Sequence, residues 1–206
     1  MELAVISDSH VPERETALPT QFRERVAAAD HTIHAGDFQT ADVLEDVRDL
    51  AAELTAVHGN VDPADLGLPA VAAVTFEGVT FVVTHGTINP VAAAVDARHV
   101  DTEMEVTEEG EIASFEARLE SDAGLVLGGE QWAAAVADTA RARGRTEPGE
   151  TVVGIGGHTH VVEDTVHEGV RVLNPGSVTG ADPAERATMM TVTVEDGEAD
   201  VTLHEA

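Results

Sequence analysis

The apolar residues of the first sixty positions fall into two alternating patterns. Three short apolar runs lack helical spacing and predict buried strands, at 3–7, 32–35 and 54–58. The two segments between them, 21–29 and 42–53, carry apolar residues at helical spacing and predict amphipathic helices with one buried face. Because strands and helices alternate, we expect parallel strands joined by right-handed crossovers.

The rest of the chain has a different pattern. Paired apolar runs flank the turn dipeptides Glu77-Gly78 and Asp196-Gly197 and predict two β-hairpins. The expected elements of this part are hairpin strands at 70–76, 79–84, 187–194 and 199–204, single strands at 152–155, 161–166 and 170–173, and a crossover helix at 130–143. The fold class is therefore α/β. We expect two mixed sheets packed face to face with helices outside, parallel strands early and antiparallel strands late.

An insertion separates the hairpin at 70–84 from the crossover helix. A strand–helix–strand unit needs roughly 30 residues, far fewer than lie between His85 and His158. From about 101 to 119, apolar residues alternate with charged ones around Glu109-Gly110, which predicts an inserted β-hairpin. Its role is open between a lid over the site, a contact in a homo-oligomer and a surface hairpin. No repeat or linker divides the chain, so we expect a single domain over 1–206.

The charge changes the picture of partners and environment. The formal net charge is -28, with 39 acidic residues against 11 basic ones, all of them arginine. Such a chain repels itself until molar salt shortens the Debye length to about 3 Å, and its composition resembles that of proteins from halophilic archaea. Without a basic patch, electrostatically steered nucleic-acid binding is not expected. We expect no disulfide because there is no cysteine, and no membrane span or signal peptide, which favours a cytoplasmic protein.

Five polar motifs each follow an apolar run: Asp8-Ser9-His10, Gly36-Asp37, Gly59-Asn60, His85-Gly86 and Gly157-His158-Thr159-His160. Loops at strand ends converge on ligands in α/β sheets, so we expect these side chains in one cleft. Carboxylate, amide and imidazole donors without thiolate suit Mn²⁺, Fe, Zn²⁺, Co²⁺ or Ni²⁺ rather than Ca²⁺. On an extended segment, the last motif directs both imidazole rings to one face. Ordinary turns and caps do not explain all five motifs together, so the sequence predicts a metal site.

In this order the motifs resemble those of the calcineurin-like metallophosphoesterase superfamily. More narrowly, they are similar to its small bacterial and archaeal phosphodiesterases, relatives of a retromer subunit that shares their fold. The segment Asn174-Pro175-Gly176-Ser177 also matches this smaller group. The resemblance runs from Leu3 to about Val194, with the insertion outside it. It implies a four-layer α/β/β/α sandwich of two mixed sheets, the metallophosphoesterase fold, with the site at the strand ends.

The resemblance also implies a role for each ligand. It assigns one divalent metal ion to Asp8, His10, Asp37 and His160. It assigns a second to Asp37, Asn60, His85 and His158, so that Asp37 bridges the two. Mn²⁺ is the expected ion, with the other transition metals as alternatives. We expect Asp37, Asn60, His10 and His158 to act in catalysis as well, the two histidines by stabilising charge.

The implied activity is that of a hydrolase that cleaves a phosphodiester in a small-molecule substrate by attack of a metal-bridging hydroxide. The alternatives are a phosphomonoesterase of the same fold and a non-catalytic protein-binding scaffold like the retromer relative. Many superfamily members carry His after the Gly-Asn motif, but this chain has Val61, followed by Asp62. Because Val61 cannot protonate a leaving group, we expect a preference for substrates with good leaving groups. If the rate does not depend on the leaving group, another acid takes part, and Asp62 is the first candidate to check.

Some polar and aromatic residues near the motifs are expected to be structural. We expect His34 and His58 to pack or to hydrogen-bond behind the ligands, Trp132 to lie in the core, and 174–177 to form a turn beside the site.

Overall fold

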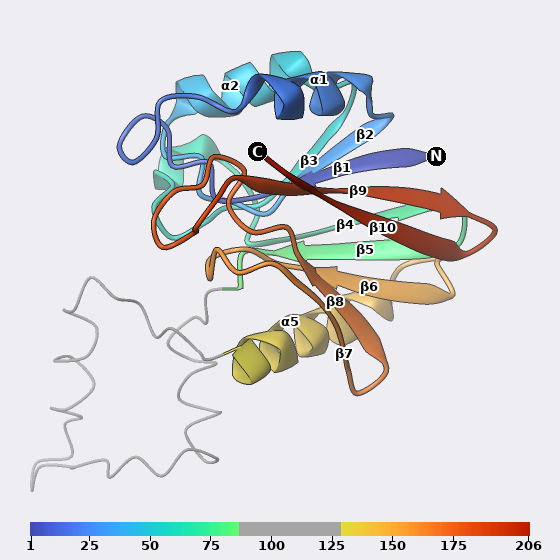
Figure 1. The fold of residues 1–206 in the computed structure, drawn as a ribbon. Helices are drawn as coiled ribbons and strands as arrows, with labels where there is room; N and C mark the ends of the chain where they lie inside the picture. Colours follow the sequence, from blue (N-terminus) through green and yellow to red (C-terminus); the bar gives the residue numbers. More distant parts are fainter. Residues whose placement is uncertain (87–128) are drawn as a thin grey trace, which may run out of the picture.

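The computed structural model describes residues 1–86 and 129–206, which form two five-stranded mixed sheets (Figure 1). The first sheet has the strand order β10 (Glu198–Glu205), β9 (Thr188–Glu195), β1 (Glu2–Ile6), β2 (His31–His34) and β3 (Leu54–Ala56). The second sheet has the order β4 (Val71–Phe76), β5 (Val79–Thr84), β6 (Thr151–Ile155), β8 (Val170–Asn174) and β7 (Glu163–His167).

Helices cover the outer face of each sheet. The helices α1 (Thr20–Ala28) and α2 (Ala41–Leu50) lie on the first sheet, and α5 (Gly129–Gly144) lies on the second (Figure 1). A short 3-10 helix, η1 (Ala64–Leu66), follows β3. The expected four-layer α/β/β/α sandwich is therefore confirmed. The expected inserted hairpin at 101–119 lies outside the described residues.

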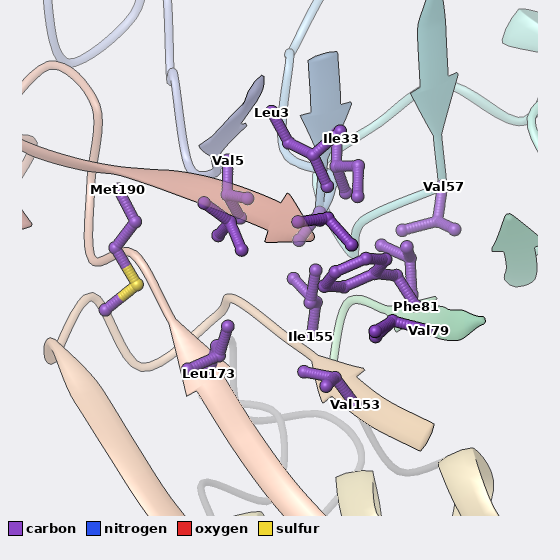
Figure 2. Close-up of a cluster of buried hydrophobic side chains, with 14 residues drawn as sticks. Leu3, Val5, Ile33, Val57, Val79, Phe81, Val153, Ile155, Leu173 and Met190 are labelled. Carbon is purple, nitrogen blue, oxygen red and sulfur yellow. The ribbon is translucent and has the colours of Figure 1, made fainter. Parts of the chain in front are cut away.

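Strand β1 is buried on both faces, which explains why its sequence does not alternate between apolar and polar residues. Leu3 and Val5 point into the core between the two sheets, and Ala4 and Ile6 point into the core beneath α1 and α2. All four side chains are fully buried, so the strand reads as one apolar run. Figure 2 shows the first of these cores, where residues of the first sheet meet Phe81, Ile155 and other residues of the second.

Strand β5 is shared in the same way between the middle core and the helix α5. Phe81 points toward the first sheet, and Val82 packs with Trp132 of α5. Trp132 is 1% exposed, which confirms the expected core position.

Three details differ from the sequence prediction. The helix α2 ends at Leu50 rather than near 53, because Ala51 is extended (ψ 142°) and β3 begins three residues later. Strand β7 begins at Glu163, which leaves Val161 exposed in the preceding loop. Strand β6 is parallel to both β5 and β8, so late strands are not all antiparallel. The crossover through α5 returns the chain to the same end of the sheet, which makes β6 parallel to β5.

The topology brings four strand ends to one edge of the sandwich. The ends of β1 and β2 are aligned in parallel register, with Ile6 opposite His34. The ends of β5 and β6 are aligned in the same way, with Val83 opposite Ile155. Each of these four strands runs directly into one of the polar motifs. Among the described helices, none is long and apolar enough to cross a bilayer.

Candidate metal centre

The structure brings all seven predicted ligands together, in two overlapping groups. The first group contains Asp8, His10 and His160, whose potential donor atoms lie within 4.8 Å of one another. His10 Nε2 is 3.0 Å from His160 Nε2, and Asp8 Oδ1 is 3.3 Å from His160 Nε2. These side chains are buried, so one anionic oxygen and two ring nitrogens face a common point that is shielded from water.

The second group surrounds Asn60. The Oδ1 atom of Asn60 is 2.9 Å from His85 Nε2 and 2.9 Å from His158 Nδ1. Asp37 Oδ2 is 3.3 Å from the same His85 nitrogen. Asn60 is exposed and His158 is half-buried, so the centre opens to solvent on this side.

Asp37 lies between the two groups. Its Oδ2 atom is 3.5 Å from His10 Nε2 in the first group and 3.3 Å from His85 Nε2 in the second. Its other oxygen, Oδ1, accepts a hydrogen bond from the backbone N–H of Val61 at 3.1 Å. The carboxylate is thereby held with one oxygen directed toward both groups, which is the geometry that a bridging ligand needs.

Two histidines are fixed in the orientation that metal ligation requires. His85 Nδ1 donates to the Ala35 carbonyl at 2.7 Å, and His160 Nδ1 donates to the Ala181 carbonyl at 2.8 Å. A ring that gives its Nδ1 proton to a backbone oxygen presents its Nε2 lone pair inward when neutral. The donor set therefore fits divalent transition-metal ions.

The charges of the centre shift the pKa values of its members. Burial raises the pKa of both carboxyl groups, but the hydrogen bond and charge of His160 lower that of Asp8 overall, and those of His85 lower that of Asp37. Burial lowers the pKa of His85, but the hydrogen bond and charge of Asp37 outweigh burial and raise it to about 9. Burial lowers the pKa of His10. His85 and Asp37 thus stabilise each other's charged forms.

Left-handed backbone conformations direct most of these side chains. Five predicted ligands have positive φ, from 48° to 70°: Asp8, His10, Asp37, His158 and His160. Such conformations are uncommon for residues other than glycine and cost on the order of 1–3 kcal/mol each. The prediction that the His158-Thr159-His160 segment is extended was therefore wrong. With both histidines left-handed, His158 points to Asn60 and His160 points to Asp8, so the two rings serve different groups.

Asp62 supports the centre through the backbone and is not placed as an acid. Its buried carboxylate accepts four backbone hydrogen bonds, from the N–H groups of Asp37 (2.9 Å), Phe38 (2.7 Å), Gln39 (2.9 Å) and Gly59 (2.8 Å). These donors occupy both oxygens and hold the Asp37 and Asn60 loops together. These contacts give Asp62 a structural role and argue against it as the fallback acid.

The turn at 174–177 supports the loop that carries His158 and His160. The Nδ2 atom of Asn174 donates to the Gly157 carbonyl at 3.2 Å and to Thr159 Oγ1 at 2.9 Å, and Oδ1 accepts from Gly176 N–H. Ser177 Oγ donates to the Asp8 carbonyl at 2.8 Å. This turn is structural, as expected, and it connects the first and last ligand motifs.

Two further residues act behind the ligands. His34 is fully buried, where burial lowers its pKa to about 4, and its Nδ1 accepts from Gly36 N–H at 3.1 Å. Its Nε2–H therefore donates to Ser9 Oγ at 2.8 Å. His34 thus forms hydrogen bonds behind the ligands, as expected. Thr179 Oγ1, which the sequence analysis missed, donates to the Ser9 carbonyl at 2.8 Å. A threonine in a loop gives no signal that could have revealed this contact.

Comparison with known proteins agrees with this geometry. The sequence profile of the calcineurin-like phosphoesterase superfamily domain matches residues 1–111 and 99–197. A protein named probable metallophosphoesterase from Methanocaldococcus jannaschii is 33% identical over 88 residues, 43% of this chain and 44% of the relative. A second, from Methanothermobacter thermautotrophicus, is 29% identical over 106 residues, 50% of this chain and 60% of the relative. The matches thus span roughly half the length of these relatives.

Solved structures show the same fold. Vps29 from Entamoeba histolytica in complex with Zn²⁺ has a TM-score of 0.63 at 23% identity, covering 100% of this chain and 98% of that one. Protein TM1076 from Thermotoga maritima has a TM-score of 0.61 at 26% identity, covering 100% and 99%. Since the family profile matches most of the sequence, the chain belongs to the calcineurin-like phosphoesterase superfamily.

Proposed function

We propose that this protein is a dinuclear-metal phosphodiesterase, a cytoplasmic hydrolase of small-molecule phosphoesters. The observation that carries the proposal is the position of Asp37 Oδ2, 3.5 Å from His10 Nε2 and 3.3 Å from His85 Nε2. One carboxylate between two donor groups is suited to bridging two cations. Asp8, His10, Asp37 and His160 would hold the first ion, and Asp37, Asn60, His85 and His158 the second, with Mn²⁺ as the proposed metal.

When bound, two divalent cations supply an activated water and neutralise charge on the phosphoryl group. The chain itself provides orientation. The carbonyls of Ala35 and Ala181 hold the rings of His85 and His160, and Val61 N–H holds Asp37. His158 and Asn60 lie on the open side of the centre, where a phosphoester enters and where His158 can donate a hydrogen bond to a phosphoryl oxygen. His10 is buried and acts by holding its ion and balancing the charge of Asp37.

A non-catalytic scaffold is the second candidate function, because the structural neighbours include Vps29. The donor set argues for the enzyme. A scaffold has no need for seven convergent ligands, five of them held in unfavourable left-handed conformations. A phosphomonoesterase would use the same centre, so substrate preference must be measured.

The direct experiment compares hydrolysis of bis(4-nitrophenyl) phosphate and 4-nitrophenyl phosphate by Mn²⁺-loaded protein, with metal content measured in parallel. Asp37→Asn removes the bridging charge but keeps Oδ1 for Val61 N–H, so the fold should persist. We expect a turnover loss of at least about a hundredfold, since even groups behind metal ligands account for 10–100-fold effects.

Asp65→Asn provides the matched control, because Asp65 is exposed on η1 and outside both donor groups. It should keep the parent's turnover and metal content. Two bound metal ions and near-normal turnover in Asp37→Asn would contradict the bridging role. A metal-loaded parent that cleaves neither ester would favour the scaffold, and faster cleavage of the monoester would favour the phosphomonoesterase.

A further inference from the structure

Arg14 is anchored at both ends beside the first donor group. Its backbone N–H donates to the His10 carbonyl at 3.0 Å, and its guanidinium Nη1 donates to the Asp182 carbonyl at 3.0 Å. The preceding residue, Glu13, accepts a hydrogen bond from Gln39 Nε2 at 2.7 Å. The loop that carries Arg14 is therefore tied to the loop that carries Asp37 and to the segment at Asp182.

The Asp182 carbonyl places the guanidinium near the peptide group that holds His160. His160 Nδ1 donates to the carbonyl of Ala181, the residue before Asp182. The guanidinium and the imidazole are therefore hydrogen-bonded to the carbonyls of two consecutive residues, whose Cα atoms are about 3.8 Å apart.

This guanidinium is available to a ligand. Most described arginines have a carboxylate oxygen within 4.0 Å: Arg23, Arg48, Arg141, Arg143, Arg171 and Arg186. Arg14 has none among the described residues, and its side chain is exposed. A guanidinium presents five N–H donors in a planar fork that matches phosphate oxygens, and the contact with Asp182 uses one of its nitrogens.

We propose that Arg14 is a substrate-binding residue that contacts a phosphoryl oxygen at the edge of the metal centre beside His160. This inference rests on the proposed function and assigns the substrate's phosphate group a protein contact besides the metals. In a chain with a net charge of -28, a phosphoester approaches against general repulsion. One fixed cation next to the ligands lowers that barrier locally and orients the phosphate.

Binding of inorganic phosphate to the Mn²⁺-loaded protein, measured by titration calorimetry, tests the role without relying on turnover. The variants are Arg14→Ala and Arg14→Lys. Arg145→Ala is the control. Arg145 is exposed and lies just after α5, near the start of β6, whereas the metal ligands follow the other end of that strand. We expect Arg14→Ala to weaken phosphate binding about ten- to a hundredfold, as loss of a charge-assisted hydrogen bond does. Arg14→Lys should be intermediate, and the control unchanged. Mn²⁺ content and melting temperature should match the parent in all three variants.

The inference and the proposed function can fail separately. If the parent hydrolyses phosphoesters and Arg14→Ala retains its phosphate affinity and KM, the inference is wrong and the proposed function stands. A fall in Mn²⁺ content or melting temperature of Arg14→Ala, in step with the loss of phosphate, would also overturn it, because Arg14 would then only support the loop. If the parent binds phosphate through Arg14 but cleaves no ester, the inference stands and the proposed catalysis fails.

Discussion

Replacement of Asp62 by Asn should destabilise the fold and the metal centre together. The Oδ2 atom of Asp62 accepts from the N–H groups of Asp37 and Gly59, and Oδ1 accepts from those of Phe38 and Gln39. Asn has one oxygen and one NH₂ group, so in either orientation two buried backbone donors face another donor. The other two donors keep an oxygen, but it no longer carries charge.

The size of the effect follows from these contacts. A buried donor without a partner costs about 1–3 kcal/mol, so two of them cost about 2–6 kcal/mol. That is a large part of a typical stability of about 5–15 kcal/mol. For a chain of this size, about 4 kcal/mol corresponds to a fall in melting temperature of roughly 8–16 °C. Because Asp37 N–H is one of the donors, its carboxylate should also lose its position, and Mn²⁺ affinity should fall about 10–100-fold.

Thermal unfolding in molar KCl and Mn²⁺ titration of Asp62→Asn check both numbers, with Asp65→Asn as the exposed control. A melting temperature and metal affinity equal to the parent's would show that the four backbone contacts contribute nothing, and the reasoning would be refuted. If Asp62→Asn also lost turnover, and only on esters with poor leaving groups, while its stability and metal affinity stayed unchanged, Asp62 would act as a proton donor.

Three further predictions follow from the charge and the geometry. The melting temperature should rise from dilute buffer to molar KCl, because salt screens a net charge of -28; a constant value would defeat the halophilic interpretation. Mn²⁺ affinity of metal-free protein should rise roughly tenfold per pH unit and level off near pH 9, because His85, with its pKa raised to about 9, must lose its proton to bind metal; titrations at several pH values check this slope. Gly59→Ala should abolish Mn²⁺ binding, since its Cβ would lie 2.0 Å from Asp37 Oδ1; Gly67→Ala meets nothing within 4 Å, so its positive φ of 66° should lower stability but leave Mn²⁺ binding intact.

The sequence predicted the layers and the convergence of the candidate ligands for a common reason. A strand buried on both faces usually leaves an apolar run, as in Leu3 to Ile6, and the run ends where the chain reaches the edge of its sheet. Strand β2 is an exception in composition, because three of its four buried residues are His or Thr. The polar residue directly after the run must therefore lie at that edge. This reasoning located Asp8, Asp37 and His158 without any knowledge of their contacts.

The conformation of the ligand loops could not be predicted in this way. His158 and His160 are left-handed because distant groups hold them: Asp8 accepts from His158 N–H at 3.1 Å, and Asn174 holds Gly157 and Thr159. These partners lie far from the loop in sequence, so a local pattern favours the ordinary extended form. The fourfold backbone contact of Asp62 was missed for the same reason, since a buried Asp in a turn looks like any other turn residue.

The same contacts imply that ligand residues and supporting residues should respond differently to substitution. Left-handed backbone at five ligands stores strain on the order of 1–3 kcal/mol per residue. Asp62 and Asn174 hold that strain through buried hydrogen bonds to the backbone, so their loss should lower stability and metal affinity together. Among residues 1–86 and 129–206, the Asp37 side chain accepts a single backbone hydrogen bond, from Val61 N–H, and Asn can preserve it. Asp37→Asn should therefore lose metal with a smaller loss of stability, which comes from the missing charge beside His85. If both classes of variant lost stability equally, the ligands themselves would be holding the loops, and the division between them proposed here would be wrong.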